Sequence, residues 1–165
     1  MPKKDPAKLT KVSVGLPWGI GKAEWEADPT ERRAAWSLYV ELVTRIATQP
    51  MDMDIGLLRE ALSSLHSLFG TTRQILKEAG PDVGAKRESV GGIAIVVLNK
   101  GIRPFLSEWH PELLVWEEQR SSGVSPKDHE RAWDKEAELR GALEKLRQGL
   151  EQYANSLAEI AGVKG

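Results

Sequence analysis

The strongest hydrophobic period of the sequence lies in its last third. Apolar residues recur there at alternating spacings of four and three over three heptads, with charged residues between them. Such spacing puts the apolar side chains on one helix face. It predicts a long helix that begins with Ser125 as N-cap and Pro126 in the first turn, and that ends near Ala161, before Gly162. The apolar stripe comprises Leu139, Leu143, Leu146, Leu150, Tyr153, Leu157 and Ile160.

The same spacing predicts a second helix from about Ile55 to Ala79. Gly70 is a position at which this helix would bend or split, and Gly80-Pro81 would end it. The stripe that we expect to face its neighbours comprises Leu58, Leu62, Leu65, Phe69, Thr72, Leu76 and Ala79.

An earlier helix is predicted from its start signal. Asp28 is a good N-cap, Pro29 suits the first helical position, and Glu31 completes a capping-box-like pattern. We expect this helix to stop before Pro50. Its apolar stripe comprises Trp36, Val40, Val43 and Ala47, and it is widened by Tyr39, Leu42 and Ile46.

Residues 90–98 are apolar on nearly all sides, which is typical of a central, buried helix. A strand is the competing interpretation, because β-branched residues are frequent there. A helix that starts near Ser89 is favoured because the apolar pattern continues to Trp109. We expect Pro104 to kink this third helix and Pro111 to open a further short segment.

Residues 1–27 read as a lead segment. Val12, Val14 and Leu16 alternate along the chain, a weak signal for extended chain. One proline and two glycines at 17–21 then interrupt any regular element. The sequence therefore predicts an all-α fold: a four-helix up-and-down bundle over residues 28–165, with a kinked third helix, and an irregular N-terminal arm over 1–27 that packs on this body through its tryptophans.

Composition excludes several classes of protein. The 165 residues include no cysteine, which rules out disulfides, zinc–thiolate sites and iron–sulfur clusters. A net charge of −1 argues against general nucleic-acid binding. No secretory leader is recognisable, and the longest apolar run, Ile93 to Leu98, is too short to span a membrane. We expect a cytoplasmic protein that does not bind membranes.

The histidines do not have the spacing of metal ligands. No glutamate precedes His66, His110 or His129 by three residues, and Asp128, His129 and Glu130 are explained as the polar first turn of a helix. We therefore expect no metal site and no cofactor.

The densest group of chemically versatile side chains lies between Arg103 and Pro111. Arginine pairs with anions, and the nearby Trp109 and His110 offer contact area and hydrogen bonds, so this stretch is the best candidate for a ligand or partner site. The alternative is a kinked helix whose freed carbonyls are satisfied by nearby side chains. Trp116, Trp18 and Trp25 complete the candidate binding residues, as partly exposed interface anchors.

Three strings of the sequence carry a resemblance: residues 15–19 (GLPWG), 61–72 (ALSSLHSLFGTT) and 97–111 (VLNKGIRPFLSEWHP). Together they are similar to small helical proteins of bacterial conflict, or antiphage defence, systems. The resemblance covers most of the chain and assigns no residue a role. It implies a component that works beside an effector protein.

The function predicted from these features is that of a non-catalytic protein–protein interaction component: an adaptor, scaffold or regulatory subunit, with an effector or a second copy of the chain as partner. Breaker-rich loops at 80–89 and 121–126 are candidate contact or cleavage points. The alternative is a ligand-sensing domain that binds a small anionic molecule at the bend from Arg103 to His110. An enzyme is not expected, because no catalytic motif is present.

Overall fold

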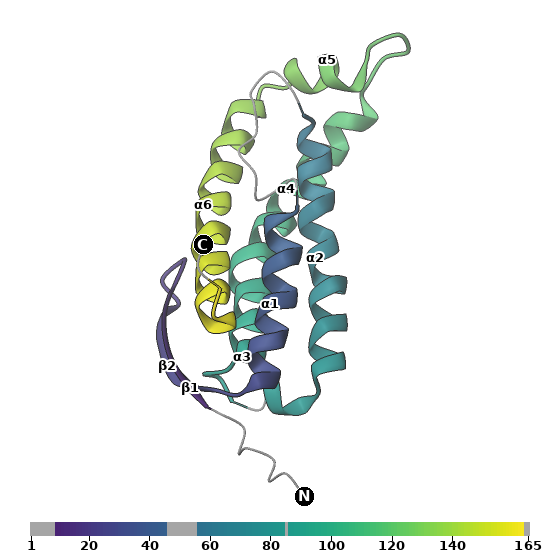
Figure 1. Cartoon of the computed structure of the whole chain (residues 1–165). Helices are drawn as coiled ribbons and strands as arrows, with labels where there is room; N and C mark the ends of the chain where they lie inside the picture. The colour runs from purple at the N-terminus through teal and green to yellow at the C-terminus, as the bar shows by residue number, and fades with distance from the viewer. Residues whose placement is uncertain (1–8, 46–55, 85, 164–165) are drawn as a thin grey trace, which may run out of the picture.

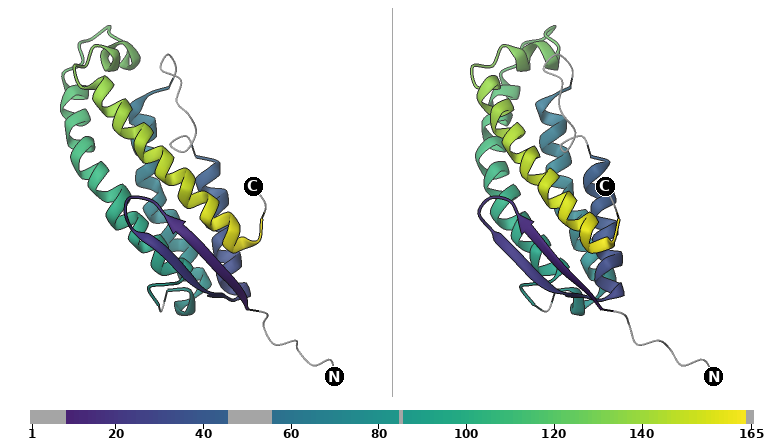
Figure 2. Two further views of the ribbon diagram at one scale, coloured as in Figure 1. Left: turned by 90° about the vertical axis from the view of Figure 1, so that its left-hand side faces the viewer. Right: turned by 60° about the vertical axis from the view of Figure 1, so that its left-hand side comes forward.

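The computed structural model describes residues 9–45, 56–84 and 86–163. It is mostly helical, with a small two-stranded sheet. Four long helical stretches lie alongside one another, and a β-hairpin crosses them on one side (Figures 1 and 2). The elements in chain order are β1 (Thr10–Leu16), β2 (Gly21–Ala27), α1 (Pro29–Val43), α2 (Leu58–Ala79), the 3₁₀ turn η2 (Pro81–Val83), α3 (Val90–Val96), the π-helical turn η3 (Val97–Ile102), α4 (Arg103–Glu118), α5 (Pro126–Arg131) and α6 (Glu136–Ala161).

The prediction of an irregular N-terminal arm is wrong. Strands β1 and β2 form a regular antiparallel pair, with Leu16 opposite Gly21. The residues that were expected to interrupt the chain instead make a tight hairpin turn, in which Ile20 N–H donates to Pro17 O at 3.2 Å. Both central residues of this turn have positive φ, 56° at Trp18 and 72° at Gly19, as a type I′ turn requires. The alternating apolar residues of β1 are buried, and this strand packs on α6.

Helix α1 begins as predicted, because the Asp28 side chain accepts from Glu31 N–H at 2.7 Å. Its predicted apolar stripe is wrong at two positions, since Trp36 is 47% exposed and Val40 is 37% exposed. Leu42 is buried as predicted, and Tyr39 and Val43 pack half-buried against the core. The buried face also includes Ala34 and Ala35. These small side chains let α1 approach α6 closely, and α1 makes its most extensive helix contact there. Ile46 and Ala47 lie outside the described residues.

The stripes of α2 and α6 follow the predicted period. In α2, the first five stripe positions are buried and Leu76 and Ala79 are half-buried. The helix continues unbroken through Gly70 and ends at Gly80. All seven predicted positions of α6 are buried, and Gly162 closes the helix with φ 78°. These two stripes form much of the hydrophobic core.

The predicted third helix is a continuous run from Val90 to Glu118 that contains a π turn. Ser89 caps its start by accepting from Gly92 N–H at 3.0 Å, as expected. The irregularity lies in η3, just before Pro104, because proline has no N–H to donate to the carbonyl one turn earlier. Pro111 does not open a new segment but lies inside α4. The run is not buried on all sides, since Ile95 is 48% exposed.

The predicted helix from Ser125 to Ala161 is divided in two. Ser125 caps α5 by accepting from Asp128 N–H at 3.1 Å, but α5 ends at Arg131 and α6 begins at Glu136. Between them, Trp133 is buried with its ring perpendicular to that of Trp109, the centroids 6.3 Å apart. This burial places Trp133 in the core and turns the chain at the end of the molecule remote from the hairpin (Figure 1).

Two buried carboxylates hold helix starts that lie far away in the sequence. Glu31 Oε2 accepts from the first N–H of α3, at Val90, over 3.1 Å and from the Trp25 indole over 2.9 Å. Glu130 accepts from the first N–H of α2, at Leu58, over 2.9 Å. A carboxylate at a helix N-terminus satisfies an unpaired N–H and complements the helix dipole. These contacts fix the positions of α2 and α3 relative to the rest of the fold.

The run from Val90 to Glu118 has the length and apolar composition of a membrane-spanning helix, with a mean hydropathy of 1.3 over its most apolar window. Half of that window is buried inside the protein, and core helices of soluble proteins share this property. The expectation that the chain does not bind membranes therefore stays a prediction.

Candidate anion-binding groove between α2 and α4

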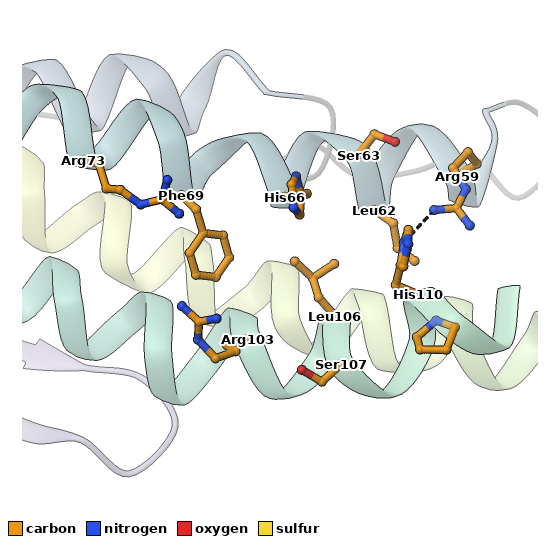
Figure 3. Close-up of a pocket in the computed structure, with 11 residues that line it drawn as sticks. Arg59, Leu62, Ser63, His66, Phe69, Arg73, Arg103, Leu106, Ser107 and His110 are labelled. Atoms are coloured by element: carbon orange, nitrogen blue, oxygen red, sulfur yellow. Dashed lines mark hydrogen bonds between the residues drawn. The ribbon is translucent and has the colours of Figure 1, made fainter. Parts of the chain in front are cut away.

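An open groove of about 570 Å³ runs between α2 and α4 on the outer surface of the helices (Figure 3). Its floor is apolar and consists of Leu62, Phe69 and Leu106. The polar lining from α2 comprises Arg59, Ser63, His66 and Arg73, and α4 contributes Arg103, Ser107, His110 and Pro111. Three arginines and two histidines thus meet along one surface, and none of the lining residues that the structure describes carries a carboxylate.

The helical period brings these cationic and imidazole groups into line. Arg59, His66 and Arg73 follow one another at intervals of seven residues in α2, and Arg103 and His110 are also seven apart in α4. Seven residues are nearly two turns of an α-helix, so each set projects from a single face. The two helices run antiparallel, which places Arg73 near Arg103 at one end and Arg59 near His110 at the other (Figure 3).

Arg103 is oriented by contacts on both sides of its guanidinium group. Its Nε donates to Asn99 Oδ1 at 3.1 Å, and its Cζ lies 4.9 Å from the ring centroid of Phe69. These contacts leave the remaining N–H groups of the planar guanidinium available to an acceptor. Within the part of the chain that the structure describes, neither Arg103 nor Arg73 is paired with a carboxylate. This end of the groove therefore carries two cations with uncompensated charge.

Arg59 is already engaged at the opposite end. Its Nε donates to both carboxylate oxygens of Glu117, at 2.9 and 3.1 Å, and its Nη1 donates to His110 Nδ1 at 2.9 Å. Because a guanidinium can only donate, His110 Nδ1 accepts, and a neutral His110 then carries its proton on Nε2. Arg59 and Glu117 nearly cancel in charge, so this end offers hydrogen-bond donors rather than net positive charge.

Of the six predicted binding residues, the structure places Arg103 and His110 in the groove. Trp109 does not line it, because its indole is only 5% exposed and packs on Trp133. Trp116 lies on another face of α4, stacked on the His129 ring at 4.3 Å between centroids. Its indole N–H donates to His129 O at 2.8 Å, so Trp116 attaches α5 to α4.

The two tryptophans of the hairpin lie away from the groove. Trp25 is half-buried and donates to Glu31. Trp18, 36% exposed, covers Gly101 of η3 and Gly149 of α6, which have no side chains to prevent its close approach. The structure therefore does not bring the six predicted residues together into one site.

Sequence reasoning missed the contribution of α2 to the groove. The sequence pattern leads us to consider His66 only as a metal ligand, and it does not single out Arg59 or Arg73. A signal was present in the seven-residue repeat Arg59–His66–Arg73, which matches the interval between Arg103 and His110. The period shows that each set shares a face, but not that the two faces meet.

A second, smaller hollow of about 400 Å³ lies between α1 and α2. The exposed Trp36 and Val40, one turn apart on α1, border it together with Ile75 of α2. Glu41 and Glu78 also line this hollow, so its charge is opposite to that of the groove between α2 and α4. It is an amphipathic surface with one large exposed indole.

Among the described residues, no group of three or more histidine, aspartate or glutamate side chains is arranged to hold a metal ion. Comparison with known proteins adds no relative from which a site could be transferred. No protein-family model matches the chain, and neither a curated protein nor a solved structure is significantly similar to it.

Proposed function

We propose that the protein is a non-catalytic binding component that recognises an anionic ligand in the groove between α2 and α4. The observation that carries this proposal is that Arg73 and Arg103 face each other across a groove whose described lining residues include no carboxylate. Arginines remain charged at all physiological pH values and present N–H donors in a fixed planar arrangement that suits carboxylates and phosphates. These properties favour recognition of an anion over acid–base chemistry.

In the proposed role, the protein is an adaptor, scaffold or regulatory subunit that works beside an effector in a cytoplasmic bacterial defence system. Its four long helical stretches would then form an up-and-down four-helix scaffold that presents the groove. The exposed Trp36 and Val40 favour a second contact, with a protein partner or another copy of the chain, because large exposed indoles are typical interface anchors. Replacing both with serine should weaken capture of such a partner without affecting anion binding.

The chemistry of the groove disfavours single-stranded nucleic acid as the ligand. Proteins that bind single strands stack bases on exposed aromatic rings. Phe69 is the one phenylalanine, tyrosine or tryptophan among the described lining residues, and it is 8% exposed and already covered by Arg103. A carboxylate or phosphate group can use the arginines without such a platform.

Calorimetric titration with inorganic pyrophosphate and with citrate tests the proposal. The wild-type protein should bind at least one of these anions, and the Arg73→Ala/Arg103→Ala double variant should bind it about tenfold more weakly or not at all. The Arg33→Ala/Arg87→Ala double variant is the matched control, because it removes two exposed cations that do not line the groove. Equal binding by all three proteins, or by none, would contradict the proposal.

A further inference from the structure

We propose that the ligand of the groove between α2 and α4 is an acidic, amphipathic helix of a protein partner. This inference rests on the function proposed above and specifies the kind of anion. Three properties of the groove carry it: the period of its walls, its length and the order of charge and apolar surface along it.

The walls of the groove are two antiparallel helices whose lining positions recur at three and four residues. In α2, the spacing from Arg59 through Leu62 and Ser63 to His66 follows this rule, and α4 repeats it from Arg103. A third helix has the same period, so its side chains can pack as ridges between those of the walls. An extended peptide would bind best along an exposed strand edge, which this groove does not offer among its described lining residues.

The length of the groove exceeds that of a small metabolite. Arg59 and Arg73 are separated by fourteen positions in α2, which corresponds to about 21 Å along the helix axis. Sites for small molecules are concave and enclose most of the ligand surface, whereas this groove is open along its length. A small anion would contact one end only, while a helix of about 14 residues would reach from one end to the other.

Along the groove, an apolar middle section lies between two ends that carry polar or charged groups. An amphipathic helix can match this arrangement with apolar side chains at its centre and acidic side chains beyond them. Arg73 and Arg103 lie at one end, Leu106 is half-buried in the middle, and Arg59 and His110 donate at the other end. Leucine-type anchors of a partner helix would cover the apolar floor, and its glutamates or aspartates would pair with Arg73 and Arg103. Charge complementarity therefore favours an acidic partner over a basic or neutral one.

A display library of helical peptides of about 18 residues tests this inference on the full-length protein. Leucines are fixed at helical spacing, and the intervening positions vary among Glu, Asp, Lys, Arg, Gln and Ser. Selection against the wild type should enrich Glu and Asp at helical intervals. The selected peptides should bind the Arg73→Ala/Arg103→Ala variant about tenfold more weakly and the Arg33→Ala/Arg87→Ala variant normally. A proline placed in the middle of a selected peptide should abolish binding, since it breaks the helix.

The result separates this inference from the proposed function. If pyrophosphate or citrate distinguishes the wild type from the groove variant, but no acidic helical peptide does, the helix assignment is wrong and anion recognition stands. Equal binding of proline-containing acidic peptides would likewise overturn the helix. Light scattering gives a further control. If the wild type is a dimer and the Arg73→Ala/Arg103→Ala variant is a monomer, a second copy of the chain occupies the groove, and the proposal of a separate partner protein is wrong. If no anion or peptide distinguishes the variants, both proposals fail.

Discussion

The indole of Trp18 occupies the space above Gly149, where a Cβ would lie 2.5 Å from Trp18 Nε1 and Cε2. This contact joins the hairpin turn near the start of the sequence to α6 near its end. The backbone of Trp18 has φ 56°, an unfavourable conformation for a bulky residue. The packing of its ring on the glycine surface, which also includes Gly101, offsets this local strain.

Gly149→Ala should therefore lower the free energy of unfolding by about 1–3 kcal/mol, because the added methyl group would displace the indole. Gly141→Ala is the matched control in the same helix, since nothing lies within 4 Å of its Cβ position. That substitution should raise stability by about 0.5–1 kcal/mol through helix propensity. Urea denaturation followed by circular dichroism measures both changes.

A double-mutant cycle identifies the cause of the Gly149→Ala effect. In a Trp18→Ala background, the same substitution should become neutral or stabilising, because the obstructing ring is absent. An equally large loss of stability in both backgrounds would show that Trp18 and Gly149 are not coupled, contrary to the contact described above.

The buried Glu31 carboxylate should be important for the start of α3. Glu31→Gln keeps one oxygen that can accept from Val90 N–H and the Trp25 indole, but it removes the carboxylate charge that strengthens both hydrogen bonds. We expect a loss of about 1 kcal/mol, since hydrogen bonds to an ionised acceptor are stronger than those to a neutral one. Glu26→Gln, an exposed position on β2, should change stability by less than about 0.5 kcal/mol. Hydrogen exchange at Val90 should accelerate in the Glu31 variant alone.

Glu130 should make stability depend on pH. Burial raises the pKa of this carboxyl above its ordinary value of 4.5, and this effect outweighs the opposing contributions of Leu58 N–H and Arg140. The folded state therefore holds the proton more tightly than the unfolded chain does. The stability contributed by the group is fully present below the unfolded pKa and is lost as pH rises through the folded pKa.

Urea denaturation between pH 4 and pH 8 tests the role of Glu130. The wild type should lose stability relative to Glu130→Gln as pH rises, because glutamine does not ionise. Glu118→Gln changes an exposed position of α4, so its free energy of unfolding should differ from that of the wild type by a constant amount across this pH range. A wild type that gains stability relative to Glu130→Gln as pH rises would mean that the folded pKa is lowered rather than raised.

The geometry of Arg103 should matter beyond its charge. Arg103→Lys keeps the cation but loses the planar group over Phe69 and the Nε donor to Asn99. Loss of a cation–π contact of about 0.5–1 kcal/mol should weaken anion binding about two- to fivefold. Arg33→Lys should have no effect. Calorimetry with the anion that binds the wild type measures both, and equal affinities for Arg103→Lys and wild type would contradict the oriented guanidinium.

Features set by residues close together in the sequence were predictable. The stripes of α2 and α6 follow the helical period, and the caps at Asp28, Ser89 and Ser125 are formed with N–H groups three residues away. In each case, the residues that form the feature are also the residues that make up the sequence signal. The helical character of the fold therefore follows from the pattern alone.

Features set by distant partners were not predictable. The hairpin depends on a turn whose Trp18 is held by glycines more than eighty residues away in the sequence. The buried face of α1 depends on how closely α6 approaches Ala34 and Ala35, which a count of apolar residues does not reveal. In the same way, Arg103 and His110 could be selected from their composition, whereas Arg73 becomes relevant only when α2 lies beside α4.

An NMR titration of the arginine side-chain Nε–Hε signals with inorganic pyrophosphate tests most directly whether an anion binds between α2 and α4. The signals of Arg73 and Arg103 should shift along one binding curve, while that of Arg33 should not move. Uniform shifts of all exposed arginines, or unchanged signals at Arg73 and Arg103 together with a saturable shift elsewhere, would contradict anion binding in this groove.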